Sequence, residues 1–484
     1  MHQRKIGVFL FVIASLLSFV SRSQDSVSIS GGALTLQQCV DIAIKNNLLV
    51  RQRDLQMQTT GVNYKQAKDY LLPTVNAQGG YGINFGRSLN QNTYTYSDQQ
   101  FNSGSYGINA GLNLFNGLQV LNGIKQNALL LEASRMDWQQ QKDAITLNVI
   151  LAYLQILSSQ DLLLISRAQA DVDAKQVARL DIMMKDGAVQ FLSTYYDLKG
   201  QYAGDLVAIS NGINAVETAK INLFGVLNIP YVRDASYERI PLDLTIPEYG
   251  KSADSIYQTA LGTLPIIKSV DLKARASEKA LAVARGVYYP SLSAYGSLGS
   301  NYSSVATSQT PANIFSDTSK NSYVTVGGGD HFIISNVQNF DFVKIPFGDQ
   351  LKNNRYEQIG LQLNIPILYY FRARNNVKLA KINLKNAQVL AKSTRNDLQQ
   401  QVEQAYQNMI NAYEQYKSYR DQVAAYTESF RATEIRFNAG AITSVDYIIA
   451  KNNIDRANTN FTAAKYNYIF RTKILDYYQG KLTW

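Results

Sequence analysis

Four short segments of the chain alternate apolar residues with small or polar ones at a period of two. The first follows Pro73, where an apolar series beginning at Val75 alternates with a series of Thr, Asn, Gln and Gly. This alternation predicts β-strands with one apolar face and one small, polar face. The predicted strands cover about 74–83, 106–115, 291–299 and 358–367.

The length and the two faces of these strands are typical of a membrane barrel. A tilted membrane-spanning strand takes about 9–11 residues, with its apolar side toward lipid and its other side toward water. A soluble β-sandwich is the competing interpretation, but its inner faces would need large interlocking side chains. The side chains predicted to face lipid are Val75, Tyr81, Ile108, Leu112, Leu292, Leu298, Leu361 and Leu363, and the second strand is expected to continue this face to Leu114.

Four strands are too few for a closed barrel, because known small barrels have about eight. Unpaired sheet edges cannot face lipid. The chain is therefore expected to contribute a four-stranded sector to an oligomer, and three chains would supply twelve strands.

Long helical hairpins follow each pair of strands, at about 117–228 and 371–480. One arm, 120–186, would be about 100 Å long at 1.5 Å per residue, far more than a bilayer. The apolar residues of these arms step by four and three in turn, which predicts a coiled-coil seam. The seam residues are Leu398, Val402, Ala405, Met409, Ala412, Tyr416 and Tyr419 in one arm and Ile145, Val149, Ala152, Ile156, Ser159, Leu163 and Ser166 in the other.

The chain contains an internal repeat. DYLLPTVNA around Pro73 resembles GVYYPSLSA around Pro290, and MKDGAVQFLS around Gly187 matches FNAGAITSVD around Gly440. The second copy is longer by 36 residues between these landmarks (440 − 290 against 187 − 73). The extra residues fall between 299 and 356, which we predict to be a loop, with Gly327 to Gly329 as a flexible part.

The repeat divides the chain into copies at 24–228 and 254–484, joined by a linker at 229–253, and a helix opens each copy at about 36–70 and 254–287. Residues 1–23 have a basic start, an apolar run from Ile6 to Val20 and small residues after it, which predicts a secretory signal peptide. A short membrane anchor is the competing interpretation of this run.

Composition limits the chemistry that the chain can perform. It has 484 residues, a net charge of +10, two histidines and one cysteine, Cys39. The basic residues are spread thinly, which disfavours nucleic-acid binding, and Cys39 is expected to be a small buried helix residue. No His, Cys and carboxylate cluster has metal-ligand spacing. We expect no enzyme activity, no metal and no cofactor.

With these elements in place, the chain resembles the TolC-like outer-membrane efflux proteins, also called outer-membrane factors. The resemblance rests on LTLQQCVDIAIKNN (34–47), the helix–Pro–strand junctions, GLNLFNG (111–117) and the segment 436–469, which begins RFNAGAITSVDYIIAKNN. It implies a mainly α-helical chain with a transmembrane β sector. In a homotrimer this would form a 12-stranded β-barrel and a continuous helical barrel, with an equatorial belt from the linker and the terminal segments.

The resemblance also implies function and partners. Such proteins are passive exit ducts of tripartite efflux pumps in the outer membrane of Gram-negative bacteria. They dock a periplasmic adaptor (a membrane fusion protein), which joins them to an inner-membrane transporter of RND or ABC type. A duct for type I protein secretion is the alternative within this class, and a non-pore periplasmic coiled-coil scaffold is the alternative outside it.

Two site hypotheses follow from the aligned residues. Adaptor docking is expected at the hairpin tips, Asp186, Gly187 and Ala188 in one copy and Ala439, Gly440 and Ala441 in the other. The competing interpretation is two ordinary helix-to-helix turns, with Gly supplying the positive φ.

A periplasmic gate is expected at Asp446, with Ser193 at the matching position of the first copy. The sequence departs from the family pattern, because Ile449 replaces the second carboxylate and Ile442 the basic residue. A helix N-terminal Asp, favoured by the helix dipole, is the competing interpretation of Asp446.

Overall fold

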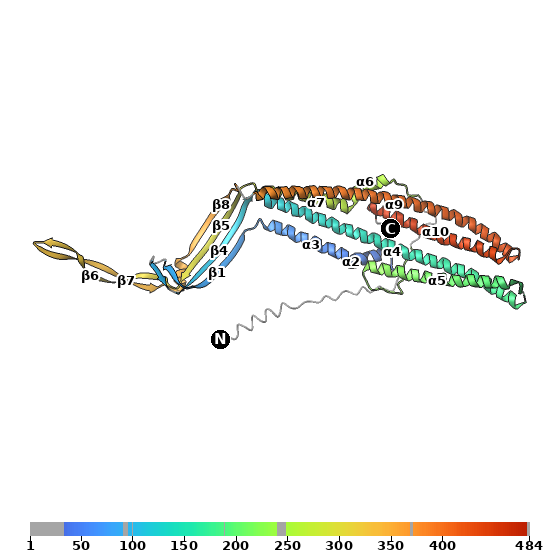
Figure 1. The fold of residues 1–484 in the computed structure, drawn as a ribbon, viewed down its shortest axis with the longest axis horizontal. Coiled ribbons are helices and arrows are strands. Elements are labelled where there is room, and N and C mark those ends of the chain that lie inside the picture. The colour runs from blue at the N-terminus through green and yellow to red at the C-terminus, as the bar shows by residue number, and fades with distance from the viewer. Residues whose placement is uncertain are drawn as a thin grey trace. The chain divides into compact units, whose positions relative to one another are not determined.

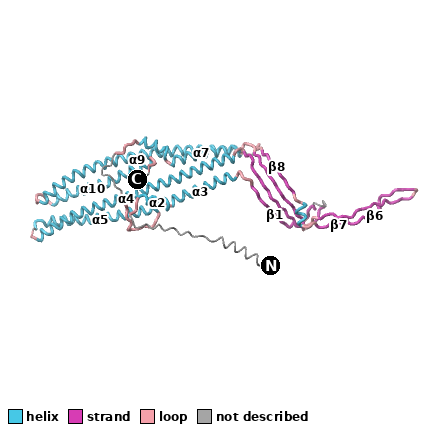
Figure 2. The backbone as a smooth tube through the Cα atoms, turned by 180° about the vertical axis from the view of Figure 1, so that it is seen from behind, coloured by secondary structure: helices cyan, strands magenta, loops and turns pink. Residues whose placement is uncertain are grey.

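A computed structural model of the chain describes residues 33–90, 95–98, 100–187, 189–239, 248–367 and 371–481. The predicted signal peptide, Ala188 and part of the linker lie outside the described residues. Figures 1 and 2 show the elements from opposite sides.

The helices and strands occur in the order that the repeat predicts. The helices are α2 (Leu36–Asn46), α3 (Leu48–Asp69), α4 (Gln119–Lys185), η2 (Val189–Phe191), α5 (Leu192–Leu227), α6 (Ala253–Thr263), α7 (Pro265–Gly286), α8 (Phe347–Asn353), α9 (Arg372–Asn438) and α10 (Ser444–Tyr478). The strands are β1 (Thr74–Asn84), β2 (Arg87–Asn90), β3 (Thr95–Asp98), β4 (Phe101–Asn116), β5 (Ser291–Ser303), β6 (Thr307–Val326), β7 (Gly329–Lys344) and β8 (Tyr356–Asn364). The structure adds the short strands β2 and β3, the hairpin strands β6 and β7, and the short helices η2 and α8.

The chain forms two compact units, and each draws on both copies of the repeat. One unit comprises residues up to Asp54, Trp138–Leu264 and residues from Asp397 onward. The other comprises Leu55–Asp137 and Pro265–Asn396 and holds every strand named above.

The four predicted strands form one antiparallel sheet in the order β1-β4-β5-β8, as Figure 1 shows. Its register places apolar residues in rows across the sheet: Val75 pairs with Ala110, Ala110 with Gly296, and Gly296 with Ile359. Because side chains alternate along a strand, the Asn, Gln, Ser and Gly residues occupy the other face. The predicted two-faced sheet is confirmed.

The ends of the strands differ from the prediction. β4 begins at Phe101, and β8 ends at Asn364, before Pro366, which has no N–H to donate to a ladder. A register shift between Asn113 and Phe115 bulges Leu114 out of the pairing, so Phe115 pairs with Leu292. Leu114 and Phe115 thus lie together opposite Leu292 of the apolar face, and the prediction that Leu114 continues this face stays a prediction.

The segment predicted to be one long loop contains two strands and a helix. β6 and β7 pair in a hairpin, and Gly327 and Gly328 have φ of +71° and +92° at its two-residue turn. Positive φ at both positions is what this kind of hairpin turn requires, so these glycines form a tight turn. The sequence did not predict these strands, because both faces of the hairpin are exposed. A strand with no buried face needs no alternation of apolar and polar residues.

The first helix of each copy, predicted as continuous, is broken. Pro265 begins α7 after Leu264, whose backbone is extended, as the steric demands of a following proline favour. Asn47 ends α2, and its side-chain oxygen accepts from the backbone N–H groups of Leu49 and Val50 at the start of α3. Neither break interrupts the apolar pattern, which explains why the pattern did not predict them.

The long helices carry the predicted seam. α4 and α9 have 67 residues each, about 100 Å at 1.5 Å per residue. The seam positions Val149, Ile156, Val402 and Met409 are buried. Among the described helices, α4 has an apolar stretch long enough to cross a membrane, and 44% of that stretch is buried inside the chain.

The largest core lies in the first unit, where α2, α4, α5 and the linker meet. Cys39 is fully buried there, as predicted, and burial raises the pKa of its thiol to about 12. The Tyr153 hydroxyl lies 2.9 Å from the Leu34 carbonyl oxygen and 2.7 Å from that of Glu238. The linker therefore packs with the segment before α2.

Candidate functional site: the hairpin tips and the two-faced sheet

The tip between α9 and α10 is a closed helix-ending motif. Gly440 has φ of +71°, its N–H bonds to the Phe437 carbonyl at 2.9 Å, and the Ala441 N–H bonds to the Arg436 carbonyl at 2.9 Å. This pair of bonds defines a Schellman motif, in which glycine supplies the left-handed residue. The turn alone accounts for the glycine, whereas it does not account for the small exposed neighbours Ala439 and Ala441.

The tip between α4 and α5 is also turned by a glycine. Gly187 has φ of +89° and bonds to the Met184 carbonyl at 3.1 Å, after which η2 leads into α5. Asp186 and Gly187 are exposed. A Cβ added at either Gly187 or Gly440 would meet no described atom within 4 Å, so space is open on the side of each turn where a side chain would stand.

An aromatic core joins the two tips within one chain. Tyr447 of α10 is fully buried with Leu180 and Leu198, and its ring stacks on Phe437 at 4.5 Å between centroids. Polar contacts surround this core: Ser444 donates to Asp197 at 3.2 Å, and the Arg179 guanidinium donates to the Asn438 side chain. These contacts therefore hold the hairpin tips of the first and second repeat together within one chain.

Asp446 lies at the start of α10 in a capping box. Its backbone N–H donates to the Thr443 hydroxyl at 3.3 Å, and its carboxylate accepts from the Thr443 hydroxyl at 2.8 Å and from the Thr443 N–H at 3.3 Å. A carboxylate at this position satisfies free N–H groups of the helix start. The capping role of Asp446 is thus observed, and its role in a gate stays a prediction.

The other predicted gate residues are exposed on the same part of the chain. Ile449 is exposed on α10, one turn after Asp446, and Ser193 is exposed in the first turn of α5. Ala188, predicted for docking, lies outside the described residues.

The second candidate site is the apolar face of the sheet. Val75 and Leu361 are 68% and 67% exposed, and Tyr81, Ile108, Leu298 and Leu363 are exposed on the same face. Leu112 and Leu292 are half-buried on that face. A continuous apolar face of this kind indicates contact with a membrane or another protein.

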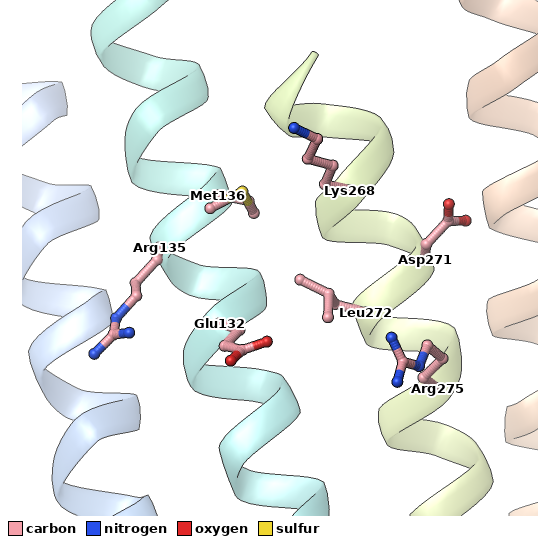
Figure 3. A pocket seen from close by; sticks show the side chains of 7 residues that line it. All are labelled: Glu132, Arg135, Met136, Lys268, Asp271, Leu272 and Arg275. Carbon is pink, nitrogen blue, oxygen red and sulfur yellow. The ribbon is translucent and has the colours of Figure 1, made fainter. Parts of the chain in front are cut away.

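A groove lies between α4 and α7 in the second unit, and Figure 3 shows the side chains that line it. Met136 and Leu272 lie between the two helices, whereas Asp271 points away and pairs with Arg395 of α9. Charges of both signs line the groove, which is typical of a solvated helix seam. Among the described residues no group of three or more His, Cys, Asp or Glu side chains could hold a metal ion.

Several buried residues of the tip region were not predicted from the sequence. Lys451, Asp173 and Asp205 are buried near Tyr447, although charged residues are normally expected on the surface. The available signal was spacing, because Lys451 follows Tyr447 by four residues and precedes Ile454 by three, which is the series that the buried positions of a helix follow.

These observations define a class of protein. A four-stranded sheet with an exposed apolar face, joined to helices far longer than a bilayer, is the architecture of an outer-membrane channel subunit. The family model for outer membrane efflux proteins matches residues 39–194 and 256–473, more than half of the chain, and the chain belongs to that family.

Known relatives agree with this assignment. The outer membrane protein TolC of Escherichia coli is 23% identical over 397 residues, covering 75% of this chain and 71% of TolC. The outer membrane protein VceC of Vibrio cholerae has a similar fold, with a TM-score of 0.70 at 13% identity over 92% of this chain and 96% of VceC. The CmeC outer membrane channel of Campylobacter jejuni gives a TM-score of 0.65 at 18% identity, over 96% and 90%.

The family assignment confirms the predicted class of protein, its location and its fold class. The protein is an outer-membrane efflux channel, not an enzyme, with its helical part in the periplasm of a Gram-negative bacterium. The predicted fold class, a helical barrel with a β sector, is that of the channels whose structures it resembles.

Proposed function

We propose that three copies of the chain form a passive duct, with a 12-stranded barrel in the outer membrane and a helical barrel in the periplasm. The observation that carries this proposal is the open sheet. Among the described strands, β1 and β8 each have one unpaired edge, and the apolar face between them is exposed. Unpaired edges cannot face lipid, so neighbouring copies must pair with them.

The lining of the duct follows from the register. The face opposite the apolar rows carries Asn76, Gln78, Ser293 and Gln362, with glycines between them. Small and polar side chains keep such a channel wide and wet. A lining of this kind has no residue suited to chemistry, so the duct passes substrates without transforming them.

The tips are the proposed contact with the rest of an efflux pump. They would dock a periplasmic adaptor, which in turn joins an inner-membrane transporter of RND or ABC type. The support is the pair of turns at Gly187 and Gly440, each with an exposed surface and no described atom close enough to limit access. Small residues there permit a close approach of a partner's backbone.

Asp446 is the proposed gate carboxylate. In a trimer, three copies of Asp446 near the axis would attract cations and repel one another. Ile449 and Ser193 would make the rest of the constriction less charged than a ring of acidic residues. The capping box and the gate are compatible, because the cap uses the hydroxyl and N–H of Thr443 on one side of the carboxylate.

Single-channel recording of the purified mature protein in planar bilayers tests both parts of the proposal. We expect discrete conductance steps that divalent or trivalent cations block from the tip side. Asp446→Ala should weaken this block by removing the charge. Thr443→Ala removes the same capping box but keeps the charge, so its block should stay near that of the wild type.

The outcomes separate the two claims. Well-folded protein without conductance would overturn the duct. Conductance with equal block in all three proteins would overturn the gate and leave Asp446 as a capping residue.

A further inference from the structure

A group of four charged side chains, three of them buried and the fourth, Asp455, half-buried, lies where α10 packs against α4 and α5. Lys451 of α10 is 2% exposed, Asp173 of α4 is fully buried and Asp205 of α5 is 9% exposed. The Lys451 ammonium lies 2.6 Å from the carboxylate of Asp455, also on α10, and 3.2 Å from that of Asp173. The group thus joins a helix of the second copy to both helices of the first copy's hairpin.

The charges of this group do not balance. Three carboxylates face one ammonium, so full ionisation would leave two negative charges in a buried place, which is costly. Both oxygens of Asp173 and one oxygen of Asp205 are buried without a well-aligned hydrogen bond from the described chain. Asp173 and Asp205 interact side chain to side chain, and two carboxylates can share a hydrogen bond only if one carries a proton.

The electrostatic surroundings agree with a bound proton. Burial, and then the neighbouring Asp205, raise the pKa of Asp173 to about 7, against the opposing effect of Lys451. Burial raises the pKa of Asp455, while Lys451 opposes it. The hydroxyl of Tyr447 on α10 is buried beside these carboxylates, and it interacts with Glu434 of α9 as well as with Asp173 and Asp455.

We propose that Lys451 and the three carboxylates form a proton-dependent clamp that positions α10 against α4 and α5. Lys451 is the positioning residue, and the proton shared by Asp173 and Asp205 completes the clamp. This inference rests on the proposed function, because the clamp would set the position of the tip that carries the gate.

The link from the clamp to the tip is short. Lys451 follows Tyr447 by four residues, about one helical turn, and Asp446 lies at the start of the same helix. Besides the apolar core around Tyr447, other polar contacts across the same interface are single hydrogen bonds: Ser444 to Asp197, Gln201 to Asn452, and Gln169 to the Asp455 carbonyl. Because α10 is one helix, a loosening at Lys451 is passed directly to Ser444 and Asp446.

The direction of the pH effect follows from linkage. Asp173 has a higher pKa when α10 is docked than when it is exposed to water, so docking takes up a proton. Docking is therefore strongest below the ordinary pKa of an aspartate and weakens as pH rises toward about 7. Above that value the clamp holds an extra negative charge, and α10 separates more readily.

A thiol placed at Ser444 reports the separation of α10 from α5. Ser444→Cys is nearly isosteric and sits at a buried contact with Asp197. The native Cys39 is fully buried with a pKa of about 12, so it contributes little background. The rate of reaction with a maleimide would be measured in the full mature protein in detergent between about pH 6 and 8.5, a range that spans the ionisation of a group with a pKa near 7.

The same reporter is compared in three backgrounds, so the ionisation of its own thiol cancels. In Asp173→Asn, which mimics the protonated side chain, the rate should follow thiol ionisation alone. In the native background the reaction rate should increase about tenfold more between about pH 6 and 8.5 than it does in the Asp173→Asn background. The reason is that the ionised fraction of a group with a pKa near 7 increases about tenfold over this range. Asp171→Asn, at an exposed ion pair on the same helix, should behave as the native background does.

A second variant keeps the test decisive if the reporter perturbs the tip. Lys451→Met should make the reporter react rapidly at every pH, with no change in the helical circular dichroism. The same pH dependence in the native and Asp173→Asn backgrounds would overturn the clamp. Channel conductance measured on the same samples tests the duct separately, so failure of either idea is recognisable by itself.

Discussion

At Gly440 the backbone conformation favours glycine, and the surface around this position is open. Its φ of +71° closes the Schellman motif at the end of α9, and no described atom lies within 4 Å of the place where a Cβ would stand. A side chain there would meet no clash, so its cost is backbone strain alone, about 1–2 kcal/mol for an L-residue in the left-handed region. The neighbouring Ala441 has no such constraint, so turn and docking roles can be separated.

Gly440→Ala should destabilise the helices by about 1 kcal/mol, because the turn must be held in a left-handed conformation. Ala441→Trp should leave stability nearly unchanged while it crowds the tip. Thermal unfolding followed by circular dichroism measures the first effect, and capture of the purified adaptor measures the second. If Ala441→Trp binds the adaptor normally, the tip is only a turn.

At the scale of elements, the sheet depends on the difference between its two faces. The register brings Leu361 of β8 level with Ala294 and Leu112 on the apolar face, while Gln362 and Ser293 pair on the other. In a soluble sheet an exposed apolar face would be a liability, whereas toward lipid it is the stable arrangement. Two adjacent residues of one strand should therefore respond in opposite ways to the same substitution.

Leu361→Arg should destabilise the barrel by about 2–4 kcal/mol, the cost of an Arg on the lipid face near the bilayer centre. Gln362→Arg, one residue away, should fold normally and shift the ion selectivity of the channel toward anions. Heat-modifiability of the assembled protein and reversal potentials in a salt gradient report these effects. Equal tolerance of both changes would contradict the assigned faces.

At the scale of the whole molecule, the described part of a single chain leaves a sheet with open edges, which the proposed trimer would close. Its sheet ends in two unpaired edges, and the exposed residues of the long helices include large apolar side chains such as Leu164, Leu379 and Val389. In the proposed trimer, neighbouring copies around a common axis would pair with the sheet edges and cover these apolar side chains. Cys39 is the chain's single cysteine and is buried, so the proposed trimer would be held together without a disulfide through it.

The detergent-solubilised protein should therefore have the mass of three chains, each 54.0 kDa before removal of the predicted leader. Mild heating should separate it into single chains without any reducing agent. Light scattering corrected for bound detergent, with denaturing electrophoresis of heated and unheated samples, makes the measurement. A stable monomer that remains folded would contradict the proposed trimer.

Local patterns in the sequence were sufficient for the parts of the structure that obey a simple period. The two faces of β1 and the seam through Val149 and Val402 follow from periods of two and about three and a half, because burial on one side repeats at those spacings. The Gly187 and Gly440 turns were readable for a similar reason, since left-handed backbone favours glycine.

Only the tertiary structure decided the features that depend on neighbours distant in the chain. The bulge at Leu114 depends on pairing with β5, and the β6–β7 hairpin buries no face that would show a period. Lys451 and Asp173 are 278 positions apart (451 − 173), and each alone would be assigned to the surface. Their burial becomes favourable only when α10 and α4 bring opposite charges together, and no local pattern can express that condition.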